Sequence, residues 1–151
     1  MGQDCSFLAD VLSLAQVSLE ASDRESHGGD WGTPPARQVT PDAVVWPEST
    51  ADVSAVLEAA SQREVPVTPF AAGTSLEGNP VPAFEGISMN LTRLDRVREV
   101  RPDDFQIDVE AGVMGSAIEE AVTRHGLFFP PLDEGISSTN TQPMSSSELI
   151  V

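Results

Sequence analysis

The stretch that decides the fold of this chain is VPVTPFAAGTSLEG, at residues 65–78. Its first residues form a short apolar run that predicts a strand. Pro66 has no N–H for a central ladder, so it belongs at the start of this strand or at a sheet edge. A loop of mostly small side chains follows. Small side chains let backbone N–H groups approach a ligand closely, and Thr74 and Ser75 add hydroxyl donors. Such donors suit a phosphate or pyrophosphate, although an ordinary tight turn between strands fits the same residues.

The residues just before this stretch predict a strand and a helix. Residues 43–46 are an apolar run between two prolines, which is typical of a buried strand. Ser49 is the expected N-cap of a helix over residues 49–63. The buried stripe expected on this helix is Val53, Val56, Leu57 and Ala60. A strand, a helix and a second strand together predict a βαβ unit.

Beyond the loop, the pattern predicts three more strands and one more helix. Alternating apolar residues indicate strands near residues 87–91, 97–100 and 105–109. A helix is expected over residues 115–125, with Gly126 as its C-cap. The predicted fold class is therefore α+β: a small mixed sheet of about five strands packed with helices.

The first forty residues differ from the rest of the chain in their sequence pattern. Apolar residues at helical spacing predict an amphipathic helix over residues 5–21, with Asp4 as its N-cap. Residues 22–41 are rich in glycine and proline and are expected to form an irregular connector. We therefore expect residues 1–40 to form an arm rather than part of the core.

The charge is strongly negative. The 151 residues include 24 acidic residues, eight arginines and no lysine, for a net charge of -16. The carboxylates are spread along the chain, which favours a halophilic protein over a merely acidic mesophilic one. An acidic surface makes nucleic acid an unexpected partner. No apolar stretch is long enough to span a membrane and the N-terminus lacks the basic region of a secretory signal, so we expect a cytoplasmic protein.

Few residues outside the loop suggest chemistry. His27 and His125 are the only histidines, and neither has a second ligand nearby, so no metal site is expected. Cys5 is expected to be a small apolar residue rather than a nucleophile. No catalytic residue is predicted.

Several ordered motifs nevertheless resemble one family. They are PDAVVWPEST at residues 41–50, the stretch at 65–78, MNLTRLDR at 89–96, VEAGV at 109–113 and GLFFPP at 126–131, with HGGD at 27–30 ahead of them. Together they resemble the FAD-linked oxidases with a PCMH-type (vanillyl-alcohol-oxidase-like) flavin domain, in the D-lactate dehydrogenase and glycolate oxidase branch. The resemblance covers about residues 24–135.

The resemblance implies a cofactor and a set of residues that bind it. In this family the small-residue loop cradles the FAD pyrophosphate, and Asp133 aligns with a second flavin segment. Ala71 departs from the usual glycine, and at a positive φ an alanine there would cost about 1 kcal/mol. Thr74 stands where relatives with covalent flavin have histidine, so FAD here should be noncovalent. Asn90 and Arg93 are expected to be structural. The cofactor-binding residues implied are Pro69, Phe70, Ala71, Ala72, Gly73, Thr74, Ser75, Gly78 and Asp133.

The second flavin segment departs from the family pattern. Gln142-Pro143 replaces a Gly-Gly pair, so weak FAD binding is expected. The expected organisation is an arm at 1–40, the N-terminal portion of the flavin domain at 41–135 and an irregular tail at 136–151.

Three functions remain open, of which the weakest is a generic nucleotide-binding βαβ module. The first is the FAD-binding portion of a truncated oxidoreductase that acts on 2-hydroxy acids such as D-lactate or glycolate; the isolated chain would be inactive, and the acid would bind only to a full-length form. The alternative is a non-catalytic remnant of a decayed oxidase gene, or a module that associates with itself or with a partner.

Overall fold

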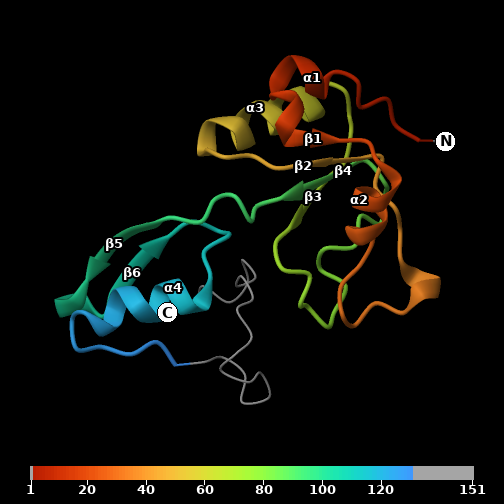
Figure 1. The fold of residues 1–151 in the computed structure, drawn as a ribbon. Coiled ribbons are helices and arrows are strands. Elements are labelled where there is room, and N and C mark those ends of the chain that lie inside the picture. Colours follow the sequence, from red (N-terminus) through yellow and green to blue (C-terminus); the bar gives the residue numbers. More distant parts are fainter. Residues whose placement is uncertain (1, 131–151) are drawn as a thin grey trace.

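The computed structural model describes residues 2–130, which form two lobes (Figure 1). The first lobe holds a four-stranded sheet with short helices around it, and the second holds a two-stranded sheet with one helix packed against it. The predicted α+β class is confirmed. The single sheet of about five strands is wrong, because within residues 2–130 the last two strands form a separate two-stranded sheet.

The first lobe is built on a parallel βαβ unit. Strand β2 (Ala43–Val45) leads into helix α3 (Thr50–Ser61), and strand β3 (Val67–Phe70) follows. Strand β4 (Ile87–Asn90) lies between β2 and β3 and is parallel to both. Strand β3 is therefore an edge strand that begins just after Pro66, as predicted.

The core of this lobe lies between α3, α1 and one face of the sheet. The Ser49 hydroxyl accepts a hydrogen bond from the Asp52 N–H at 3.1 Å, which confirms the predicted N-cap. Val56 and Ala60 are buried against Val45 and Met89 in one apolar cluster. Leu57 does not belong to this stripe and is 46% exposed. It lies about 100° around the helix from Val56, which moves it off the face that meets the sheet.

The predicted helix over residues 5–21 is wrong. The chain instead forms the short helix α1 (Leu8–Val11), a 3-10 turn η1 (Leu14–Gln16), strand β1 (Val17–Ser18) and helix α2 (Ala21–Ser26). Val17 pairs with Val45 in an antiparallel ladder, so the chain must extend where its spacing alone favours a helix. Asp4 still caps a local turn, because its carboxylate accepts the Ser6 N–H at 3.0 Å.

The expected arm also contributes to the core. Cys5, Phe7, Leu8 and Leu12 are buried in the same cluster as α3 and the sheet. The segment after α2 lies against the other face of the sheet, where residues 27–33 contact β4 and the loop after β3. It includes the 3-10 turn η2 (Pro35–Arg37). Residues 1–40 are thus part of the fold rather than an appendage.

The second lobe is a hairpin with a helix. Strands β5 (Val97–Arg101) and β6 (Gln106–Val109) are antiparallel and joined by the 3-10 turn η3 (Pro102–Asp104). Helix α4 (Gly115–Thr123) packs Ile118 and Val122 against them. Gly126 has a φ of +73° after the helix, as expected for a C-cap glycine. Phe105, expected to begin a strand, instead occupies the turn with a φ of +55°.

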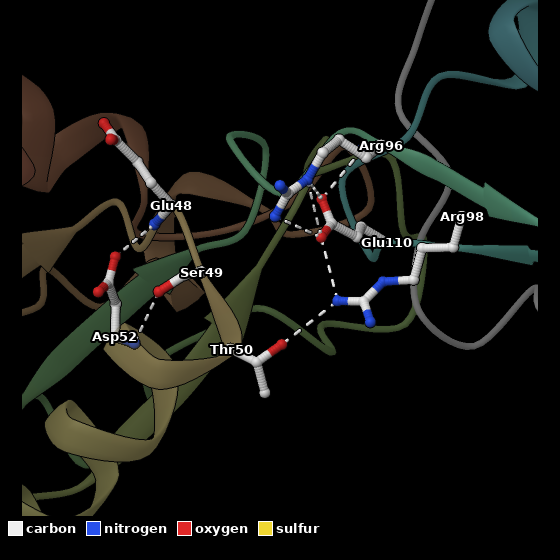
Figure 2. A network of polar contacts seen from close by, with 7 residues as sticks. All are labelled: Glu48, Ser49, Thr50, Asp52, Arg96, Arg98 and Glu110. Carbon is white, nitrogen blue, oxygen red and sulfur yellow. Dashed lines mark hydrogen bonds and ion pairs between the residues drawn. The ribbon is translucent and has the colours of Figure 1, made fainter.

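A buried carboxylate lies near the junction between the lobes, where it pairs with two arginines of the second lobe (Figure 2). The Glu110 side chain is 4% exposed and accepts hydrogen bonds from the Arg96 and Arg98 guanidinium groups at 2.9 and 3.1 Å. Arg98 also reaches the Thr50 hydroxyl at the start of α3, at 3.4 Å. The Arg96 side chain holds the pKa of Glu110 below its usual range despite burial, so this carboxylate is ionised at neutral pH.

None of the helices within residues 2–130 has the length and apolar character needed to cross a membrane.

Candidate functional site

A hollow of the first lobe lies at the carboxyl end of β3. It has a volume of about 360 Å³ and is lined by residues 69–75 together with Asn79, Pro80 and Leu91. Strand β4 ends beside it at Asn90, so the hollow lies outside the carboxyl ends of two adjacent parallel strands. Ligands of open α/β sheets bind at such edges. Seven of the nine residues predicted from the sequence are thus brought to one place.

The loop presents a run of backbone donors. Within residues 2–130, the N–H groups of residues 71–75 donate to no protein acceptor. Gly73 has a φ of +67°, and a Cβ there would lie 2.9 Å from the Phe70 ring. Successive unpaired N–H groups of this kind form a concave surface that binds anions. The Thr74 and Ser75 side chains line the same hollow, whereas no charged side chain does.

Ala71 fits this loop without strain. In the described part of the chain, the non-glycine residues with positive φ are Glu64, Glu85 and Phe105. The cost foreseen for an alanine at this position therefore does not arise.

A second segment, residues 30–33, lies directly against the loop. The N–H of Trp31 donates to the Gly73 carbonyl at 3.1 Å, and the N–H of Gly32 donates to the Ser75 carbonyl at 3.3 Å. A Cβ on Gly32 would lie 2.3 Å from the Leu76 carbonyl oxygen, so only glycine allows this approach. One Asp30 carboxylate oxygen accepts the Gly78 N–H at 2.8 Å, and the other accepts the Thr33 hydroxyl.

Sequence reasoning missed this contact. The Gly-Gly-Asp stretch was noted only as a family motif, and nothing in its spacing indicates a partner 48 residues away. Gly78 accordingly differs from its predicted neighbours, because it does not line the hollow and its N–H is engaged with Asp30. Asp133 lies outside the described residues.

His27 stands behind the loop as a structural residue. Its Nδ1 lies 2.7 Å from the Asp23 carbonyl and must carry the proton, so Nε2 accepts from the Asn90 amide at 2.8 Å. The ring packs 4.3 Å from that of Phe70. Burial lowers the pKa of His27, which keeps it neutral in this position.

The remaining candidates lie away from the hollow. Burial raises the pKa of Cys5 to about 11, so its thiol stays protonated. Arg93 pairs with Glu48 at 2.8 Å and donates to the Ala15 carbonyl, a structural contact as expected. His125 is exposed beyond the end of α4. Among residues 2–130, no three His, Cys, Asp or Glu side chains come together as a metal site would require.

The sequence matches a known family of flavin domains. A family model described as "FAD binding domain" matches residues 41–139, which is more than half of the chain. The chain therefore belongs to this family, and FAD is its cofactor. The resemblance predicted from the motifs is confirmed.

Curated relatives lie in the predicted branch. The chain is 32% identical over 123 residues to a probable mitochondrial D-lactate dehydrogenase of Danio rerio, covering 82% of this chain and 24% of that protein. It is 30% identical over 122 residues to glycolate oxidase subunit GlcD of Bacillus subtilis, covering 78% of this chain and 26% of that protein. The chain thus spans about a quarter of the length of these relatives.

Solved structures share the fold. A 4-ethylphenol oxidase of Gulosibacter chungangensis superposes with a TM-score of 0.68 at 23% identity, covering 80% of this chain and 24% of that one. An alkyldihydroxyacetonephosphate synthase gives a TM-score of 0.69 at 20% identity, covering 79% and 26%.

Proposed function

We propose that this chain binds FAD through residues 71–75 and serves an oxidoreductase that acts on a 2-hydroxy acid such as D-lactate or glycolate. The observation that carries the proposal is the run of five N–H groups that have no acceptor among residues 2–130, beside two hydroxyls in the loop. These donors suit the FAD diphosphate without a lysine, which this chain does not contain. The substrate class follows that of relatives named as D-lactate dehydrogenases and a glycolate oxidase subunit.

The described residues bind and orient the cofactor. FAD supplies the hydride-accepting chemistry when it is bound. The residues that line the hollow include no acid or base, so we expect no oxidation of D-lactate or glycolate by this 151-residue chain alone. Thr74 has no nucleophilic nitrogen, so binding is noncovalent. Because Gln142-Pro143 replaces the family's Gly-Gly pair, we expect weak affinity.

Several expectations from the sequence accompany this proposal without a structural test. They are a flavin domain at residues 41–135 with a tail at 136–151, a contribution of Asp133 to FAD binding, a cytoplasmic location and adaptation to salt. The non-catalytic remnant receives no support from the comparisons, which align the chain with a probable D-lactate dehydrogenase and a glycolate oxidase subunit.

Titration with fragments of the cofactor tests the proposal. We expect FAD to bind with a dissociation constant in the micromolar-to-millimolar range, corresponding to about -8 to -4 kcal/mol. ADP, which carries a diphosphate, should compete with FAD, whereas riboflavin, which carries none, should compete poorly. FAD should leave the protein on acid precipitation. Competition by riboflavin but not by ADP would place the diphosphate elsewhere, and absence of FAD binding would refute the proposal.

A further inference from the structure

Residues 30–33 make three hydrogen bonds to the loop at residues 71–78. Trp31 and Gly32 hold the Gly73 and Ser75 carbonyls, and the Asp30 carboxylate holds the Gly78 N–H. We propose that Asp30 is a positioning residue whose carboxylate keeps residues 71–78 in the shape that binds the FAD diphosphate. This inference rests on the proposed function and assigns to that site a residue outside the loop.

The Asp30 carboxylate contacts the loop from outside the hollow. One of its oxygens accepts the Thr33 hydroxyl, and the Thr33 N–H donates to the Asp30 carbonyl at 3.2 Å, so the segment is closed into a turn. The other oxygen accepts the Gly78 N–H. Asp30 is only 8% exposed, and its negative charge is met by donors. A carboxylate that faced the hollow would repel a diphosphate, whereas this one is turned into the protein.

Two of the three contacts hold loop carbonyl oxygens, and the N–H groups of residues 71–75 are left for the ligand. Hydrogen bonds to residues 30–33 occupy the Gly73 and Ser75 carbonyl oxygens, which would otherwise be free to turn toward an anion. The N–H groups of residues 71–75 have no such partner within the described chain. Burial raises the pKa of Asp30, but hydrogen bonds from Thr33 and Gly78 outweigh it and hold the pKa below the usual range. The carboxylate is therefore a permanent acceptor at neutral pH.

A second aspartate provides a matched control. One Asp42 carboxylate oxygen accepts the Gly86 N–H and the Gln3 N–H, each at 2.9 Å. Asp42 thus ties two segments by the same chemistry as Asp30. It precedes β2 and Gly86 precedes β4, so this contact lies at the amino ends of the strands, opposite the hollow.

The experiment compares Asp30→Asn with Asp42→Asn in the full chain. FAD affinity, melting temperature and deuterium exchange of residues 71–78 are measured for each variant and for the wild type. Both substitutions should lower the melting temperature. Only Asp30→Asn should weaken FAD binding, by about tenfold, because it removes the charge and replaces one of the two acceptor oxygens by an NH2 donor. Only Asp30→Asn should speed exchange in the loop.

A second variant, with a smaller change, tests the same proposal if Asp30→Asn does not fold. Thr33→Val keeps the shape of the side chain and the Asp30 charge but removes the hydroxyl that orients it. It should weaken FAD binding in the same direction, and more than Asp42→Asn does.

Two failures can be told apart. If wild-type protein binds FAD and the Asp30 and Thr33 variants bind it as well as Asp42→Asn does, the positioning role is refuted and the proposed function stands. If wild-type protein does not bind FAD, the proposed function fails and this inference fails with it.

Discussion

The Nε2 atom of His27 lies 2.8 Å from the amide nitrogen of Asn90, a contact between residues 63 positions apart. Asn90 ends strand β4, and the Oδ1 atom of its side-chain amide in turn accepts the Thr92 N–H at 2.9 Å. The His27 ring also packs edge-on against Trp46, with ring centroids 5.7 Å apart. Through these contacts His27, which follows α2, packs beside Phe70 at the start of the loop that lines the hollow.

This contact predicts a pH-dependent stability. Burial lowers the pKa of His27 in the folded chain below its ordinary value of 6.5. At a pH between these two pKa values, His27 is protonated in the unfolded chain and neutral in the folded chain. Stability from neutral His27 is therefore complete above about pH 7 and is lost as the pH falls through 6.5 toward the lower folded pKa. His27→Gln should show a smaller decrease in urea midpoint than wild type between about pH 7.5 and about pH 5.5. The control is His125→Gln, which changes the exposed histidine; an identical decrease in wild type and His27→Gln would contradict the prediction.

The junction between the lobes predicts a costly substitution. Glu110 is buried and accepts from the backbone N–H of Arg96 as well as from two guanidinium groups. Glu110→Gln removes the charge and brings an amide against donors, so it should destabilise the chain by about 1–3 kcal/mol in urea unfolding. Glu120→Gln breaks the exposed Glu120–Arg124 pair and should have little effect. Equal effects of the two substitutions would show that the junction is not energetically important.

The sequence predicted the elements whose signals are local. The βαβ unit, the Ser49 cap and Gly126 after α4 follow from apolar periodicity and from residues with known preferences at helix ends, and the structure confirms them. The loop was found because its small residues are contiguous.

Contacts between distant residues could not be predicted. The spacing from Leu8 to Leu19 suits a helix, but pairing of Val17 with Val45 extends the chain there. Likewise, five predicted strands do not reveal which will pair, and within residues 2–130 β5 pairs with β6 instead of joining the four-stranded sheet. The attachment of Asp30 to Gly78 is a side-chain to backbone contact that no periodicity encodes.

The Cys5 thiol should be unreactive in the folded protein. It is 4% exposed, and its pKa of about 11 leaves almost no thiolate at pH 8. We expect negligible reaction with a disulfide reagent at about pH 8 in native buffer and rapid reaction of one thiol in urea. Rapid labelling of the native protein would mean that residues 5–12 do not remain packed against α3.

The charge of the chain predicts stabilisation by salt. At a net charge of -16, repulsion between carboxylates opposes folding, and salt shortens its range to about 3 Å at about 1 M. The melting temperature should rise markedly from about 0.1 M to about 3 M KCl. Sucrose, which stabilises without screening charge, should raise it less. Equal melting temperatures at the two salt concentrations would count against salt adaptation.

The central claim, that residues 71–75 bind FAD, is tested most directly by comparing FAD affinity in Gly73→Ala and Gly126→Ala. Both glycines have positive φ, +67° and +73°, so each alanine should cost about 1 kcal/mol of stability. An added Cβ meets the Phe70 ring at 2.9 Å in the first variant and nothing within 4 Å in the second, which lies after α4. We predict that Gly73→Ala weakens FAD binding about tenfold or more, whereas Gly126→Ala binds FAD as the wild type does. Equal FAD affinity in all three proteins would contradict the account.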